Sequence, residues 1–144
     1  MMLLRAALVV SLVACGAAPP PASQAPTPEA TVASADGVPI YYRSVGTGEP
    51  TVVLVHCWGC SSEEWADAIP ALAATHRVIA LDLAGHGRSG KTRHAWTVPA
   101  FAGDIRAVLD HAGVKRAIVV GHSMSGPIAI EAALAMPEDR KSVV

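Results

Sequence analysis

The sequence has few aromatic residues and no cluster of lysine or arginine. Phe, Trp and Tyr make up 4% of its 144 residues, and eleven basic residues against twelve acidic ones leave a net charge of −1. Without a basic patch, binding to the phosphates of a nucleic acid is not expected. The expected strand segments are nevertheless solidly aliphatic, which indicates one globular domain with a buried sheet and not a disordered chain.

The sequence also has no apolar run that could span a bilayer. One basic residue, Arg5, precedes a charge-free stretch of residues 6–14, a pattern typical of a secretory signal. Leu12-Val13-Ala14-Cys15 resembles the bacterial lipoprotein signal, in which the cysteine is lipidated and becomes the first mature residue. We therefore predict a signal peptide over residues 1–14 and export to the bacterial cell envelope, anchored through lipidated Cys15. Gly16 in place of aspartate would direct it to the outer membrane if the cell has one. The alternative is an ordinary cleaved signal with an incidental cysteine.

Proline is concentrated in one segment after this signal. Such a density disfavours helix and central strand and favours extended conformations. We therefore predict a linker over residues 15–30, which lifts a domain of residues 31–144 off the membrane surface. Five of the eleven prolines lie in this linker: Pro19, Pro20, Pro21, Pro26 and Pro28.

The domain alternates strand patterns with helix patterns. The turn signal Asp36-Gly37 predicts an antiparallel hairpin, and Ser61 with Glu64 predicts a capping box at the start of a helix. This order predicts an α/β fold: a mostly parallel sheet with an amino-terminal antiparallel hairpin and helices on both faces. The expected strands are residues 31–34, 40–45, 51–56, 77–81 and 116–120, and the expected helices are 61–73, 98–112 and 127–136.

One serine stands between small residues where a strand pattern meets a helix pattern, in Gly121-His122-Ser123-Met124-Ser125-Gly126. A sharp turn at such a junction brings the strand and helix backbones together, so only small side chains fit two positions on either side of the exposed residue. Gly121 and Ser125 meet that requirement. The pattern predicts an exposed, nucleophilic Ser123, although a short serine loop without catalytic duty would also produce the motif.

Three segments together carry a resemblance to a known family: Leu54 to Gly59, Leu81 to Ser89, and Gly121 to Gly126. In order and separation they resemble the amino-terminal portion of the α/β-hydrolase fold family, of the serine hydrolase type. The resemblance implies that Ser123 is the nucleophile and that backbone N–H groups of Trp58 and Met124 form the oxyanion hole. It implies a small-molecule ester or related acyl substrate, with no cofactor and no metal. Branches that resemble this fold but hydrolyse epoxides place aspartate where Ser123 stands.

The sequence has no histidine after Ser123, although the family order is serine, then acid, then histidine. The resemblance assigns His56 to the shape of the oxyanion loop and turns the side chain of His122 away from the substrate. We interpret the chain as a hydrolase truncated before its last strands, which supply the triad acid and histidine, and expect it to be inactive by itself. A catalytically dead hydrolase-fold binding protein is an alternative. The six histidines are His56, His76, His86, His94, His111 and His122.

Cysteine is scarce, but two of the three cysteines form the motif Cys57-Trp58-Gly59-Cys60. The family usually has glycine at position 57. A C-x-x-C at a strand-to-helix turn suits a thioredoxin-like redox protein, which is a further alternative, or a disulfide that braces the oxyanion loop in an oxidising compartment. Zinc is less expected, because two cysteines without a second pair make half a site.

Overall fold

The computed structural model describes residues 28–136. The predicted signal peptide, the predicted lipidation site Cys15 and most of the predicted linker lie outside the described residues. Among residues 28–136, no helix combines the length and the apolar character needed to cross a membrane.

The described residues form one five-stranded mixed sheet. Three neighbouring strands on one side of the sheet run parallel to one another. The amino-terminal hairpin pairs antiparallel with them through its second strand. Asp36 and Gly37 form the hairpin turn, where Gly37 has a φ of 83°. The strand order is β1 (Glu29–Ala33), β2 (Pro39–Val45), β4 (Val78–Leu81), β3 (Thr51–Val55) and β5 (Ala117–Gly121).

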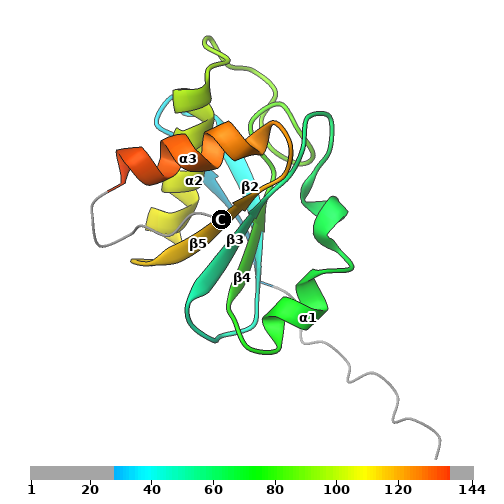
Figure 1. Ribbon diagram of the computed structural model, residues 1–144. Coiled ribbons are helices and arrows are strands. Elements are labelled where there is room, and N and C mark those ends of the chain that lie inside the picture. Colours follow the sequence, from blue (N-terminus) through cyan, green and yellow to red (C-terminus); the bar gives the residue numbers. More distant parts are fainter. Residues whose placement is uncertain (1–27, 137–144) are drawn as a thin grey trace, which may run out of the picture.

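Helices cover both faces of this sheet (Figure 1). Helices α2 (Val98–His111) and α3 (Ser125–Ala135) pack together on one face, over a core that includes Ile79, Leu81 and Ile105. The short α1 (Ile69–Ala73) lies on the other face, against a smaller apolar cluster. The predicted fold class, an α/β fold with a mostly parallel sheet and an amino-terminal hairpin, is confirmed.

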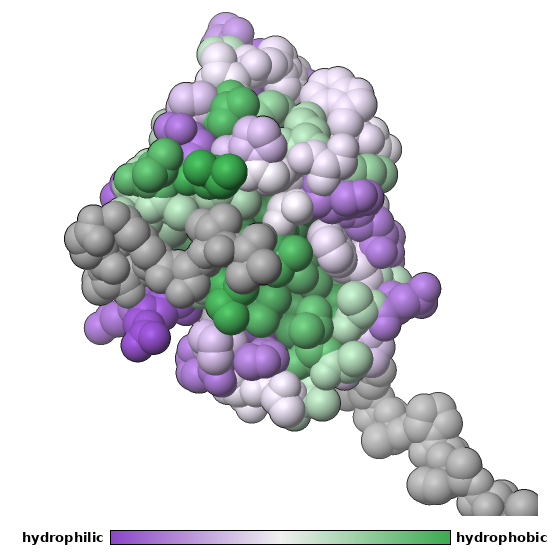
Figure 2. Space-filling model, in the orientation of Figure 1, coloured by the Kyte–Doolittle hydropathy of each residue, from purple (hydrophilic) through white to green (hydrophobic). Residues whose placement is uncertain are grey.

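Strands β3 and β4 lie in the middle of the sheet because all their side chains are apolar or small and can be buried on both faces. Every residue of both strands is buried. Strand β5 is an edge strand of the sheet formed by the described residues. Between α3 and α1, Figure 2 shows apolar surface over the sheet, where Ile118 and Val120 are only partly buried.

The predicted helix of residues 61–73 is wrong as a single helix. A four-residue 3₁₀ helix, η1 (Ser62–Trp65), comes first and α1 starts only at Ile69. Pro70 stands at the start of α1; it has no N–H to donate and its ring clashes with a preceding helical turn, so it favours a helix start at this point. The capping box is also incomplete: Ser61 caps the N–H of Glu63, at 3.4 Å, but the Glu64 carboxylate accepts from the N–H of Cys57 instead.

The domain begins earlier than the predicted linker boundary at residue 30. Strand β1 starts at Glu29, which pairs with Arg43 of β2. The backbone N–H of Ser44 also donates to the carbonyl of Pro28, at 2.9 Å. Proline lacks a donor but keeps its acceptor, so Pro28 can end the proline-rich stretch and still join the sheet edge.

Candidate active site

Three loops meet at one edge of the sheet. Because β3, β4 and β5 are parallel, the segments that follow Val55, Leu81 and Gly121 all leave the sheet at its carboxyl edge. This is where open α/β sheets place their ligands. The three motif segments of the sequence therefore converge in space.

Ser123 occupies a strained turn between β5 and α3. Its φ is 55°, and it is the one non-glycine residue of the described part of the chain with a positive φ. Such a conformation costs free energy for a residue with a Cβ and persists only where the surroundings enforce it. The turn leaves Ser123 exposed to solvent.

Gly121 is required by the close approach of strand and helix at this turn. A Cβ atom on Gly121 would lie 2.2 Å from the carbonyl oxygen of Ser125, well inside van der Waals contact. Ser125 is fully buried, and its hydroxyl donates to the carbonyl of His56 at 2.5 Å. The small residues on either side of Ser123 therefore have separate duties: Gly121 makes room, and Ser125 ties the turn to the neighbouring loop.

A second tie holds the serine turn against β3. The backbone N–H of His122 donates to the carbonyl of Val55 at 3.0 Å, which extends the β3–β5 pairing by one residue. Among the hydrogen bonds within residues 28–136, none has the N–H of Trp58 or Met124 as its donor. Both residues thus offer backbone donors at this edge of the sheet, one on each loop.

His56 is a fully buried structural residue. Its Nε2 accepts from the backbone N–H of Leu83 at 3.0 Å, so Nδ1 carries the proton and donates to the carbonyl of Cys57 at 2.7 Å. Burial lowers the pKa of His56 below the usual 6.5, which favours this neutral form. Both ring nitrogens are occupied, and His56 therefore joins the loops after β3 and β4 and has no nitrogen left for proton transfer.

Three other histidines are likewise held by local contacts. His86 Nδ1 lies 3.0 Å from the carbonyl of Ala84, and its ring stands edge-on to that of Trp58 with centroids 5.3 Å apart. His76 precedes β4 and His111 ends α2, so neither follows the carboxyl end of a strand. Their Nδ1 atoms bond elsewhere: His76 to the Pro50 carbonyl and His111 to the Tyr42 hydroxyl.

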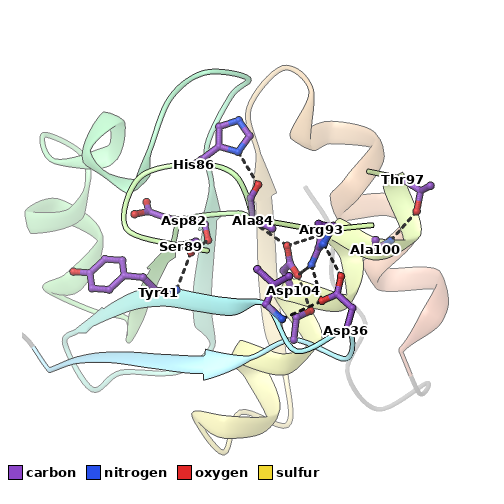
Figure 3. Close-up of polar contacts among 12 residues, drawn as sticks. Asp36, Tyr41, Asp82, Ala84, His86, Ser89, Arg93, Thr97, Ala100 and Asp104 are labelled. Atoms are coloured by element: carbon purple, nitrogen blue, oxygen red, sulfur yellow. Dashed lines mark hydrogen bonds and ion pairs between the residues drawn. The ribbon is translucent and has the colours of Figure 1, made fainter. Parts of the chain in front are cut away.

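The turn after β4 is organised by a buried carboxylate, Asp82. Its Oδ1 accepts from the N–H of Ser62 at 2.6 Å and its Oδ2 from the N–H of Arg88 at 2.8 Å. The Ser89 hydroxyl donates to the Asp82 carbonyl and accepts from the N–H of Tyr41, as Figure 3 shows. Asp82 therefore fixes η1 and this turn relative to each other and acts as a structural residue.

A buried ionic network fixes the segment that leads into α2 (Figure 3). The guanidinium of Arg93 donates to both carboxylate oxygens of Asp104, and both side chains are fully buried. Asp104 also accepts from the Ser34 hydroxyl at 2.6 Å and from the N–H of Ala84 at 3.2 Å. Burial works against the charge of Asp36, but its hydrogen bonds with Arg93 and the N–H of Val38, together with the charge of Arg93, outweigh this and lower the pKa of that carboxyl. The network joins the hairpin turn, the loop after β4 and α2.

The cysteine pair lies in the loop after β3. Cys57 and Cys60 are joined by a disulfide, on either side of the exposed Trp58. The loop leads into the 3₁₀ helix η1, not into an α-helix. The helix amides that would stabilise a thioredoxin-type thiolate are therefore not provided by an α-helix at this turn.

Sequence reasoning missed one cluster beside the serine turn. The carboxylate Oε1 of Glu64 accepts from the N–H of Cys57 at 3.1 Å and lies 3.4 Å from Nδ1 of His122. A pocket of about 410 Å³ opens here, lined by Glu64, Trp65, Gly121 and His122. The only sign of this cluster in the sequence was a glutamate, Glu64, close to the two cysteines, and the capping-box pattern assigned that glutamate to a helix start.

Comparisons with known proteins agree with the fold. The model of a family described as alpha/beta hydrolase fold matches residues 50–144. A putative carbamate hydrolase of Azorhizobium caulinodans is 42% identical over 104 residues, which cover 72% of this chain and 39% of that protein. The chain thus spans less than half the length of this curated relative.

Two solved structures extend the comparison. An enzyme that degrades N-acyl homoserine lactones, Est816, matches with a TM-score of 0.72 and 37% identity, over 80% of this chain and 42% of that one. An epoxide hydrolase from an endophytic Streptomyces matches with a TM-score of 0.74 and 37% identity, over 81% of this chain and 36% of that one.

Proposed function

The chain belongs to the α/β-hydrolase fold family, and within it we propose a serine hydrolase that acts on an ester or related acyl substrate. The observation that carries this proposal is the exposed Ser123, held at a φ of 55° between β5 and α3. A strained, exposed serine at the carboxyl edge of a parallel sheet is the arrangement that presents a hydroxyl for attack.

In the proposed reaction, Ser123 Oγ attacks the carbonyl carbon of the substrate while a histidine takes the hydroxyl proton. The carbonyl oxygen becomes an oxyanion, and the N–H groups of Trp58 and Met124 donate to it. The histidine then protonates the departing alcohol, and water hydrolyses the acyl-enzyme. Support for the two donors is that neither N–H has an acceptor within residues 28–136.

We propose that the acid and the histidine of the triad belong to a part of the whole protein that this chain does not contain. All six histidines precede Ser123 in the sequence, and the described ones with buried rings are held by structural hydrogen bonds. The chain spans 39% of the carbamate hydrolase that it resembles. The edge strand β5 and the apolar surface beside it would accept further strands and a helix. The 144-residue chain is thus proposed to be inactive by itself.

Solved epoxide hydrolases resemble this chain as closely in fold as the lactone-degrading enzyme does. The residue at the turn favours acyl chemistry, because a serine hydroxyl forms an acyl-enzyme, whereas opening an epoxide through a covalent ester requires a carboxylate nucleophile. Ser123 therefore supports an esterase, a lactonase or a related acyl hydrolase.

A fluorophosphonate probe tests this proposal on the whole protein. The probe should label Ser123, identified by peptide mass spectrometry, and Ser123→Ala should remove the label and lower hydrolysis of p-nitrophenyl acetate by about 10³-fold or more. Thr92→Ala, which removes an exposed hydroxyl outside the turn, is the matched control and should leave both unchanged. A whole protein that binds acyl ligands without labelling or turnover would instead be a binding protein. Ser123-dependent ester hydrolysis by the 144-residue chain would contradict its proposed inactivity.

We further propose export and lipid anchoring at Cys15, with the membrane surface as a partner. The support is the sequence pattern Leu12 to Cys15. Cells supplied with an alkyne fatty acid should incorporate it into the protein, and Cys15→Ser should abolish incorporation. Equal incorporation by that variant would overturn the proposal.

A further inference from the structure

Four potential metal ligands gather between the loop after β3, the helix η1 and the serine turn. One ligand atom each from Cys57, Glu64 and His122 lies within 4.8 Å of the others. Cys60 Sγ is bonded to Cys57 Sγ, so it lies one bond away from this group of three. The two cysteines that looked like half a zinc site in the sequence thus meet a carboxylate and an imidazole in the folded chain.

We propose that, when the Cys57–Cys60 disulfide is reduced, these four side chains bind Zn²⁺. The ligands would be the two cysteine thiolates, the Glu64 carboxylate and Nδ1 of His122. Two cysteines separated by two residues are a recurrent zinc-binding pair, and zinc accepts mixed sulfur, nitrogen and oxygen ligands in a tetrahedron. The thiolates favour zinc over magnesium or calcium, which prefer oxygen ligands.

The observed distances are close to those that the ion needs. With metal–ligand distances of about 2.0–2.3 Å, neighbouring ligand atoms of a tetrahedron lie about 3.3–3.8 Å apart. Nδ1 of His122 and Oε1 of Glu64 are already 3.4 Å apart. The separations from Cys57 Sγ to these two atoms are within 4.8 Å and must close by about 1 Å. The side chain of His122 is 58% exposed and can rotate to do so.

Glu64 is held in place for this role. Its side chain is 18% exposed, and its Oε1 accepts the N–H of Cys57. Backbone donors of this kind orient a coordinating carboxylate and are part of how proteins tune a metal site. The pocket of about 410 Å³ that Glu64 and His122 line leaves room for the ion to enter.

Disulfide and metal are mutually exclusive occupants of this cluster. A dithiol reductant transfers two electrons and two protons to the Cys57–Cys60 disulfide. The reductant becomes a disulfide, and the protein gains two thiols. Zinc then displaces the two thiol protons as it binds both sulfurs. In the oxidised protein both sulfur atoms are engaged with each other, and only Glu64 and His122 remain, too few ligands for tight binding.

The experiment measures zinc uptake by the whole protein, reduced with a dithiol and desalted under anaerobic conditions. A chromophoric zinc chelator serves as competitor, and Co²⁺ serves as a second probe because thiolate ligation gives it a charge-transfer absorption. We expect about one zinc per reduced chain and no uptake by the oxidised protein. His122→Ala and Glu64→Gln should each weaken zinc binding by at least about tenfold. Loss of a residue that only supports a metal ligand already weakens metal affinity by about this factor. Cys57→Ser should weaken the cobalt band, because only the Cys60 thiolate then remains to ligate the ion.

Exposed residues nearby supply the matched controls. Glu63→Gln changes the neighbouring carboxylate, which faces Arg43, and His94→Ala changes an exposed histidine; both should bind zinc as the parent does. Circular dichroism establishes that each variant is folded. If Cys57→Ser fails to fold, His122→Ala still decides the test, because the side chain of His122 is exposed and its loss should not disturb the fold. The proposal is overturned if the reduced protein takes up no zinc, if the oxidised protein takes up as much, or if His122→Ala and Glu64→Gln bind with parental affinity.

Discussion

Replacing Asp104 with alanine should lower the free energy of unfolding by about 3–5 kcal/mol, the range for a buried ion pair that loses one partner. Both Asp104 and Arg93 have fully buried side chains, so the guanidinium keeps its charge without its main partner. Asp36, which lies 2.7 Å from Arg93 Nε and is 40% exposed, compensates for part of that charge. The loss of acceptor for the Ser34 hydroxyl and the Ala84 N–H adds about 1–3 kcal/mol for each donor left unsatisfied. The two donors add about 2–6 kcal/mol before the compensation by Asp36, so the expected cost lies at the upper end of the stated range or above it.

Urea unfolding of the whole protein, followed by far-ultraviolet circular dichroism, measures this change. The midpoint should fall while the slope with denaturant stays the same, because the surface exposed on unfolding is unaltered. Arg106→Met is the matched control: it breaks an ion pair with Asp110 in which the side chains are 55% and 47% exposed, and it should change stability by less than about 1 kcal/mol.

A double variant separates the charge from the hydrogen bonds. Arg93→Met combined with Asp104→Leu removes both charges, and it should be less destabilised than Asp104→Ala alone, because no uncompensated ion remains buried. A loss below about 1 kcal/mol for Asp104→Ala would refute the reasoning. The reasoning would also be refuted if the double variant lost as much stability as the sum of the losses of Arg93→Met alone and Asp104→Leu alone. The two residues would then not interact.

Two further predictions concern the candidate site. Gly121→Ala places a Cβ 2.2 Å from the Ser125 carbonyl oxygen, so it should cost roughly 1–3 kcal/mol and reduce fluorophosphonate labelling, whereas Gly126→Ala, with no atom within 4 Å, should change either by little. Because burial lowers the pKa of His56 in the folded protein, the unfolded chain takes up this proton first, and stability should fall as pH drops below about 6.5. The loss is at most about 1.4 kcal/mol per pH unit. His56→Gln should flatten this part of the pH–stability curve, and an unchanged slope would show that other groups produce it.

Much of the site follows from local sequence. Aliphatic runs predicted β3, β4 and β5 to within a residue or two, because such runs can only be buried on both faces of a sheet. The small residues around Ser123 predicted its strained turn, since a close approach of strand and helix excludes a Cβ at Gly121. The single helix predicted after Ser61 is wrong for an equally local reason, because Pro70 favours a helix start in the middle of that segment.

The sequence by itself determined the element types, the serine turn and the family, because these depend on periodicity and on residues close together in the chain. Only the tertiary structure decided which distant side chains meet. Arg93 and Asp104 became a buried pair, and Glu64 reached both Cys57 and His122, which lies 58 positions away in the sequence. Such contacts depend on the order of the strands and on the path of the loops between them. A pattern along the chain records which side chains are available, but the fold decides which of them share one place.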